Sequence, residues 1–158
     1  MKISAQEEYG LRILLQIARS KDGDNMSIPV LSQLEGLSTA YVGKLTGILR
    51  KSGFINSNPG NVGGYILARP AEKIMVAEVL HALGGSLFEK QFCDDFVGKN
   101  QLCTHSVDCS VRSLWKVMQL SIESVLKHIT LADLCSDEDN STRILMSYLE
   151  PESQAELP

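Results

Sequence analysis

The strongest constraint on the fold is a pair of short amphipathic segments that are joined by a tight turn and followed by a glycine-rich hairpin. In the first segment Pro29 lies in the first turn of the expected helix, and Gly36 is placed to end that helix. In the second, Ser38 is a good N-cap for apolar residues that recur at three- and four-residue intervals up to Leu49. The spacing predicts two helices that meet at residues 36–38, which is the arrangement of a helix-turn-helix.

Two β-type stretches follow the second of these helices. Residues 54–56 and 65–67 bracket a run of turn formers over 57–64, which predicts a hairpin. Helix-period apolar residues over 11–18 predict one more helix of about four turns before the pair. A helix-turn-helix followed by a hairpin is a winged helix, so we expect residues 1–84 to form a DNA-binding domain of this type. An ordinary flexible hairpin is the alternative reading of the wing.

The distribution of charge favours a nucleic-acid partner, although the net charge of −4 alone would count against one. Between residues 36 and 69 there is no Asp or Glu, and the positive charges there are Lys44, Arg50, Lys51 and Arg69. The segment 131–158 is acidic instead, and we expect it to be solvated and disordered toward its end.

No targeting or membrane-spanning segment is expected. No apolar run approaches the roughly 20 residues that a transmembrane helix needs, and no secretory stretch follows Met1. With 158 residues and 44% hydrophobic content, the chain is long enough for one domain with a core and an appended element. We therefore expect a soluble, cytoplasmic protein without a membrane partner.

Three cysteines lie close together at Cys93, Cys103 and Cys109, with nine and then five residues between them. The intervening residues 94–102 are too polar and irregular for a buried strand or helix, so packing does not explain the thiols. Iron–sulfur clusters tolerate irregular spacing and prefer thiolate ligands, which favours a cluster in a loop over 85–109. Disulfides and structural zinc are the alternatives, but no secretory signal and no close cysteine pair support them.

A long amphipathic helix is expected directly after the third cysteine. Apolar residues recur from Val111 to Ile129 on more than one face. One face can close the domain, and another can meet a partner helix, so we interpret residues 110–130 as a dimerisation helix. Burial of the whole helix within one subunit is the alternative. Cys135 lies apart from the other cysteines and is expected to act as a small apolar residue beside the core.

Several segments together resemble a known family of winged-helix regulators. They are Met1-Lys2-Ile3-Ser4 with Tyr9, Leu37-Ser38-Thr39-Ala40-Tyr41-Val42 with Leu45 and Leu49, the glycine-rich residues 60–69, the three cysteines, and Ser113-Leu114-Trp115. Through them the chain resembles, to about Cys135, the family that includes the iron–sulfur regulator IscR, the nitric-oxide sensor NsrR and the cysteine-metabolism regulator CymR. The resemblance implies a homodimeric transcription factor, with a 2Fe-2S or 4Fe-4S cluster in the cysteine-bearing members. Two-fold symmetry then implies a palindromic operator in double-stranded DNA.

The fourth ligand of such a cluster departs from the family pattern. IscR-like members have a histidine three residues after the third cysteine, where this chain has Arg112. In NsrR-like members the fourth ligand is a carboxylate near the start of the first helix, and the other subunit supplies it. The resemblance places Glu8 at that position. A surface carboxylate in the first helical turn is the alternative reading of Glu8. His105 is a rival ligand, and Cys135 and His128 are more remote ones.

The resemblance also implies which residues contact DNA. Base reading is expected near the start of the second helix of the pair, phosphate contact from basic residues beyond it, and close backbone approach from glycines of the wing. These residues are Ser38, Thr39, Ala40, Tyr41 and Lys44 for bases, Arg50, Lys51 and Arg69 for phosphate, and Gly60, Gly63 and Gly64 in the wing. Pro59 stands where many relatives carry a minor-groove arginine. Gly43 and Gly47 each cost a helix about 1 kcal/mol, and close approach of DNA is one explanation for them.

The sequence thus predicts a DNA-binding repressor that senses iron–sulfur status, nitric oxide or redox stress. A cluster-free regulator of the same fold that responds to thiol chemistry or a metabolite is the first alternative. A small iron–sulfur redox protein is the second. No enzyme is expected, since the three histidines are scattered and no nucleophile and base are paired.

Overall fold

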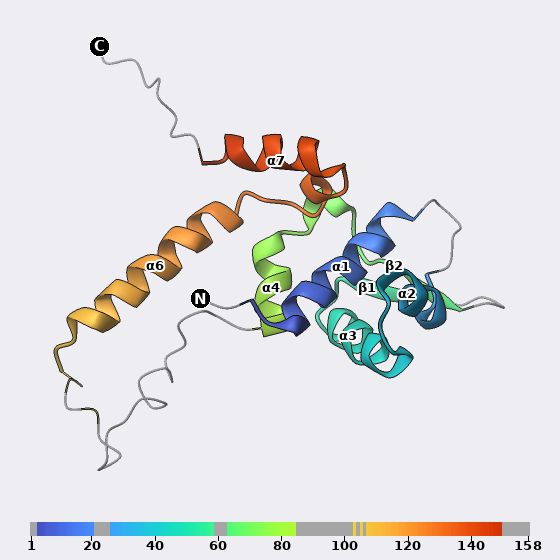
Figure 1. Ribbon diagram of the computed structural model, residues 1–158, viewed down its shortest axis with the longest axis horizontal. Coiled ribbons are helices and arrows are strands. Elements are labelled where there is room, and N and C mark those ends of the chain that lie inside the picture. The colour runs from blue at the N-terminus through green and yellow to red at the C-terminus, as the bar shows by residue number, and fades with distance from the viewer. Residues whose placement is uncertain are drawn as a thin grey trace.

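The computed structural model describes residues 3–20, 26–58, 63–84, 103, 105 and 107–149. It is mostly helical, with one antiparallel hairpin, so the predicted fold class is confirmed. In chain order the elements are α1 (Ala5–Arg19), α2 (Ile28–Glu35), α3 (Thr39–Lys51), β1 (Ile55–Asn58), β2 (Gly64–Leu67), the 3-10 turn η1 (Ala71–Lys73), α4 (Val76–Gly84), α6 (Ser110–Leu126), the 3-10 turn η2 (Ala132–Leu134) and α7 (Glu138–Ser147) (Figure 1).

The helix-turn-helix forms where the local signals predict it. The Ser38 hydroxyl accepts the backbone N–H of Tyr41 and so caps α3, and Gly36 ends α2 with a left-handed φ of 65°. Ser27 is the N-cap residue of α2 but makes no side-chain cap hydrogen bond, and Pro29 lies in the first turn. Gly36 and Ser38 therefore define the two ends of the turn between α2 and α3.

A single core joins the first three helices, the hairpin and α4. Figure 1 shows α1 between α3 and α4, and it contacts both. Gly10 allows the close approach of α1 and α4, because a Cβ there would lie 2.5 Å from a Leu83 methyl carbon. The buried core residues are Ile13, Leu14, Ile17, Leu31, Val42, Leu45, Leu49, Phe54, Ile55, Ile74, Val79, Leu83 and Leu131.

The wing starts and ends slightly differently from the expected strands. β1 pairs with β2 from Ile55 opposite Leu67 to Asn58 opposite Gly64, while Phe54 is a buried core residue just before the strand. Met26 adds an isolated bridge to the hairpin through its carbonyl, which accepts the Tyr65 N–H at 3.1 Å. Of the expected turn over 57–64, residues 59–62, Gly60 among them, lie outside the described residues.

The chain after α6 returns to the core at Leu131, just before the acidic segment that is expected to be solvated. Leu131 is fully buried, and its N–H donates to the Ile74 carbonyl at 2.8 Å. The Arg19 guanidinium then donates to three backbone carbonyls at residues 134–136. Beyond these contacts the segment forms α7, in which no residue is buried, and residues 150–158 lie outside the described part of the chain.

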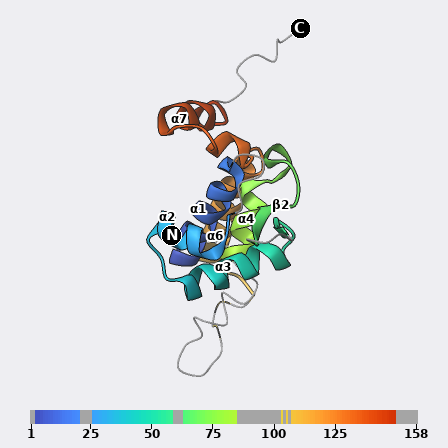
Figure 2. The same ribbon diagram turned by 90° about the vertical axis from the view of Figure 1, so that its right-hand side faces the viewer.

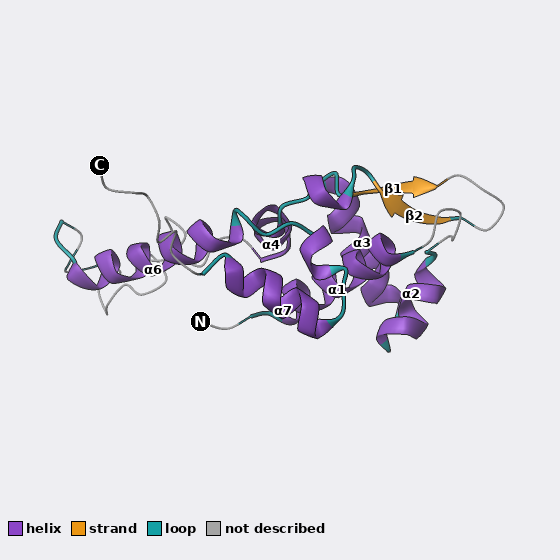
Figure 3. Ribbon diagram, turned by 90° about the horizontal axis from the view of Figure 1, so that it is seen from above, coloured by secondary structure: helices purple, strands orange, loops and turns teal. Residues whose placement is uncertain are grey.

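The two C-terminal helices differ in how they meet the body. α6 extends away from it, whereas α7 lies across one side next to η2 (Figures 1, 2 and 3). None of the residues of α6 is buried. Among the described helices, none is both long and apolar enough to cross a bilayer.

Candidate nucleic-acid interface and cysteine segment

α3 lies at the edge of the domain (Figure 2). Its outer face carries exposed basic residues. Thr39, Ala40, Lys44, Arg50 and Lys51 are all exposed. These residues recur at intervals that place most of them on one side of a helix, away from the core residues of the same helix. The face can therefore meet a phosphate backbone and base edges, as the sequence predicts.

Tyr41 and Ser38 have partners within the chain. The half-buried Tyr41 ring packs edge-to-face on Tyr9 of α1, with 6.2 Å between ring centroids. The Ser38 hydroxyl serves as the N-cap of α3. Base contacts by these two residues stay predictions, and each already contributes to the fold.

Gly43 and Gly47 lie in α3 where packing does not require a glycine. A Cβ on Gly47 would meet nothing within 4 Å, and one on Gly43 would meet only an Ile28 methyl at 3.8 Å, which is ordinary contact. The fold would therefore accept a side chain at both positions. Packing within the chain therefore does not explain the two glycines, and close approach of DNA stays the predicted explanation.

Arg69, at the base of the wing, contacts two other side chains of the protein. Its Nη2 lies 2.5 Å from a Glu78 carboxylate oxygen, and its guanidinium lies over the Phe54 ring at 5.4 Å from the centroid. These contacts link the end of β2 to α4. Phosphate binding by Arg69 stays a prediction, and it would compete with the Glu78 ion pair. Gly63 has a φ of 54°, which favours glycine, and Gly64 begins β2.

The cysteine segment is described at two of its three thiols. Cys103 and Cys109 are half-buried and form no disulfide, whereas Cys93 lies outside the described residues. The Cys109 sulfur caps α6 by accepting the Arg112 N–H at 3.3 Å. The Ser113 N–H donates to the Cys109 carbonyl at 3.2 Å. The third cysteine is thus built into the first turn of α6.

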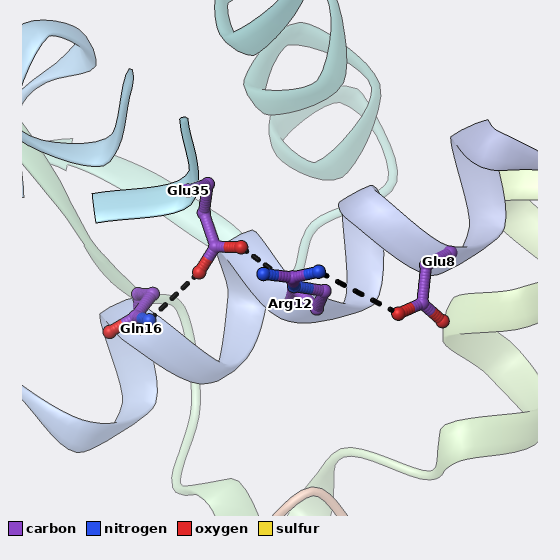
Figure 4. A network of polar contacts seen from close by, with 4 residues as sticks. All are labelled: Glu8, Arg12, Gln16 and Glu35. Carbon is purple, nitrogen blue, oxygen red and sulfur yellow. Dashed lines mark hydrogen bonds and ion pairs between the residues drawn. The ribbon is translucent and has the colours of Figure 1, made fainter. Parts of the chain in front are cut away.

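Glu8 lies in the first turn of α1 within a polar network (Figure 4). Arg12 stands between two carboxylates: its Nη1 is 4.0 Å from Glu8, and its Nε is 2.7 Å from Glu35. Gln16 donates a further hydrogen bond to Glu35 at 2.8 Å. The Glu35 side chain is only 3% exposed, whereas that of Glu8 is 55% exposed. Sequence reasoning missed Glu35, because only the i, i+4 spacing of Glu8 and Arg12 is readable locally.

The rival ligands lie in different surroundings. His105 is exposed, and its backbone carbonyl accepts a hydrogen bond from Arg112 Nη2 at 3.2 Å. The His128 ring stacks on Tyr148 with 6.4 Å between centroids. Cys135 donates its S–H to the Leu131 carbonyl at 3.3 Å, and burial raises the pKa of its thiol. This protonated, half-buried thiol matches the expected packing role of Cys135.

We expect Cys135 to react with iodoacetamide more slowly in the folded protein at neutral pH than in the chain unfolded with urea. Its raised pKa lowers the fraction of thiolate, which is the reactive form, and half-burial limits access. Mass spectrometry of peptides alkylated for increasing times measures both rates. Equal rates in the two states would contradict the packing role.

Comparison with known proteins shows similarity over most of the chain. The model of the Rrf2 family, described as iron-dependent transcriptional regulator, matches residues 3–137. Protein rrf2 of Nitratidesulfovibrio vulgaris is 36% identical over 137 residues, which cover 87% of this chain and 89% of that protein. The structure of CymR, the global cysteine regulator of B. subtilis, has a TM-score of 0.69 at 26% identity and covers 87% of this chain and 99% of its own. T. potens IscR has a TM-score of 0.66 at 30% identity, covering 99% and 93%.

Proposed function

The chain belongs to the Rrf2 family of transcriptional regulators, and from that premise we propose that it is a homodimeric repressor controlled by an iron–sulfur cluster. Cys93, Cys103 and Cys109 would hold the cluster, and a palindromic operator would meet the two α3 helices. The relatives are regulators of transcription, so membership does not support the alternative of a small electron-transfer protein, and it gives no reason to expect an enzyme.

The place of Cys109 is the observation that carries this proposal. Its sulfur accepts the Arg112 N–H and caps α6, so the cysteine segment continues directly into that helix. Hydrogen bonds from N–H groups to cysteine sulfur are among the features that tune iron–sulfur centres. A change in what the Cys109 sulfur binds would therefore act on the first turn of α6.

The kinds of donor in the chain support the proposal of a cluster with one weaker ligand. Cys103 and Cys109 are free thiols, and the Glu8 carboxylate is exposed on α1 and held only at 4.0 Å by Arg12. We propose Glu8 of the second subunit as the fourth ligand, with the exposed His105 as its rival. When bound, the cluster would supply an iron centre that reacts with nitric oxide and oxidants or reports iron–sulfur status.

Exposed apolar residues on α6 support the homodimer. Val111, Leu114, Trp115 and Met118 recur as i, i+3, i+4 and i+7, and each is at least 39% exposed. We call these four residues the α6 stripe. One turn further along the same side, Ile122 is half-buried in the chain itself. A second copy fits the α6 stripe, because identical stripes can pair about a two-fold axis.

The proposal is tested with protein loaded with iron and sulfide under anaerobic conditions. We expect Cys103→Ser and Cys109→Ser to lose the visible absorbance of the cluster and to change affinity for operator DNA by about 10- to 100-fold. The probe is a duplex selected from a random pool by wild type kept under these conditions, and Cys135→Ser is the matched control. Wild type that loads no cluster and binds this duplex equally well with and without iron would refute the proposal.

A cluster-free regulator that responds to thiol chemistry or a metabolite is the second candidate. It is supported by the similarity to CymR, which is named a global cysteine regulator. The same experiment separates the two, since the second candidate predicts a colourless protein. Its operator affinity should then change with added thiols or oxidants rather than with iron and sulfide.

A further inference from the structure

Two side chains on one face of α1 contact both helices of the helix-turn-helix. The Tyr9 ring meets the Tyr41 ring of α3 edge-on, with 6.2 Å between centroids and 84° between the ring planes. One turn further along α1, the Arg12 guanidinium carbon lies 5.6 Å from the centroid of the Tyr9 ring. The Nε of Arg12 lies 2.7 Å from Glu35, the last residue of α2 (Figure 4). Tyr9 and Arg12 therefore connect α1 to the end of α2 and to the start of α3.

Tyr41 lies at the border between the core side of α3 and its outer face. Its neighbours on the helix surface are the residues three and four positions later, the exposed Lys44 and the buried Leu45. The buried apolar residues of α3 are all aliphatic, and aliphatic packing has no directional preference of its own. An edge-to-face pair of rings does prefer a particular geometry. The Tyr9 ring can therefore determine how the first turn of α3 is rotated about the helix axis.

Reading base edges requires tighter placement of a helix than contact with phosphate does. Hydrogen bonds in the major groove depend on donors and acceptors that match in position, whereas phosphate contacts carry no sequence information. Resting on the proposed function, in which α3 meets the operator, we propose that Tyr9 is a positioning residue for base reading. Through the Tyr41 ring, it holds the first turn of α3 in the orientation that fits the base edges.

Two replacements of Tyr9 separate its ring from its hydroxyl. Tyr9→Leu removes the ring pair and keeps an apolar side chain, whereas Tyr9→Phe keeps the pair. We expect Tyr9→Leu to weaken binding to the selected duplex by about 10-fold, which is the size of one lost base contact. Binding to an unrelated duplex of the same length should stay within about 2-fold of wild type, because phosphate contacts supply it. Tyr9→Phe should match wild type on both duplexes.

The matched control is Tyr148→Leu, which makes the same replacement at the end of α7, on the side of α1 opposite to α3 (Figures 1 and 2). It should match wild type on both duplexes. Fluorescence anisotropy measures each affinity, and the readout is the ratio between the two duplexes. This ratio does not depend on the folded fraction of a variant, so equal weakening on both duplexes would mark a merely structural role and refute the proposal.

A double variant tests whether Tyr9 acts through Tyr41. Once Tyr41→Leu has removed the ring pair, the further change Tyr9→Leu should leave the affinity for the selected duplex as it is in Tyr41→Leu alone. Independent effects that multiply in the double variant would refute the role, as would a loss in Tyr9→Phe equal to that in Tyr9→Leu, which would mark direct contact by the hydroxyl.

Failure of this role can be told apart from failure of the proposed function. If wild type selects a duplex and Tyr9→Leu keeps the wild-type ratio, the role of Tyr9 is refuted and operator reading stands. Wild type that selects no duplex from the random pool refutes both.

Discussion

Replacement of Leu114 by glutamate should convert the proposed homodimer to a monomer and weaken operator binding by at least about 100-fold. Leu114 lies within the α6 stripe and is 54% exposed in the single chain. In a dimer that pairs two stripes, a carboxylate at this place would be buried on each side without a partner, which is costly. A monomer would then meet only one half of a palindromic site and lose the contribution of the second α3 helix.

Light scattering during gel filtration measures the mass, and fluorescence anisotropy with the selected duplex measures affinity. The matched control is Lys116→Glu, which changes the charge of the same helix by two units outside the α6 stripe. If loss of binding came from repulsion between α6 and DNA, Lys116→Glu would be the weaker binder of the two. Leu114→Glu protein that keeps the mass of the wild type would show that α6 is not the dimer interface.

The elements that could be predicted from the sequence are those specified by local signals. Pro29, Gly36 and Ser38 determine where α2 begins and ends and where α3 starts, and each does so through its own backbone chemistry. The amphipathic spacing after Cys109 likewise predicts α6, which begins at the expected residue 110 and ends at Leu126, before the expected residue 130. The basic face of α3 could be predicted because every acidic residue is missing from that stretch.

The parts that could not be predicted depend on partners far apart in the chain. Arg19 reaches the carbonyls of residues 134–136, and Leu131 pairs with Ile74, so an acidic segment is partly folded. Nothing local in the sequence encodes either contact. Similarly, the sequence places Tyr41 on the helix expected to read DNA, but its packing on Tyr9 depends on the contact between α1 and α3.

The second large effect is expected on stability, from loss of the ion pair between Arg12 and Glu35. We expect Arg12→Met to lower the free energy of unfolding by about 2–3 kcal/mol. Glu35 lies in the last turn of α2, where the helix dipole disfavours a negative charge, and its side chain is 3% exposed. Breaking a buried ion pair typically costs about 3–5 kcal/mol, and the 48% exposure of the Arg12 side chain reduces that cost. Urea denaturation followed by circular dichroism measures the change.

Two further variants show whether burial of Glu35 is the cause. The double variant Arg12→Met with Glu35→Gln should recover most of the lost stability, because no charge is then left unpaired. Glu8→Gln removes the other carboxylate that faces Arg12, yet it should cost less than about 0.5 kcal/mol, since that contact is 4.0 Å long and exposed. Equal effects of Arg12→Met and Glu8→Gln would contradict this account. The expected difference means that the fold depends on Glu35 but not on Glu8, so Glu8 can leave Arg12 for a ligand role at little cost.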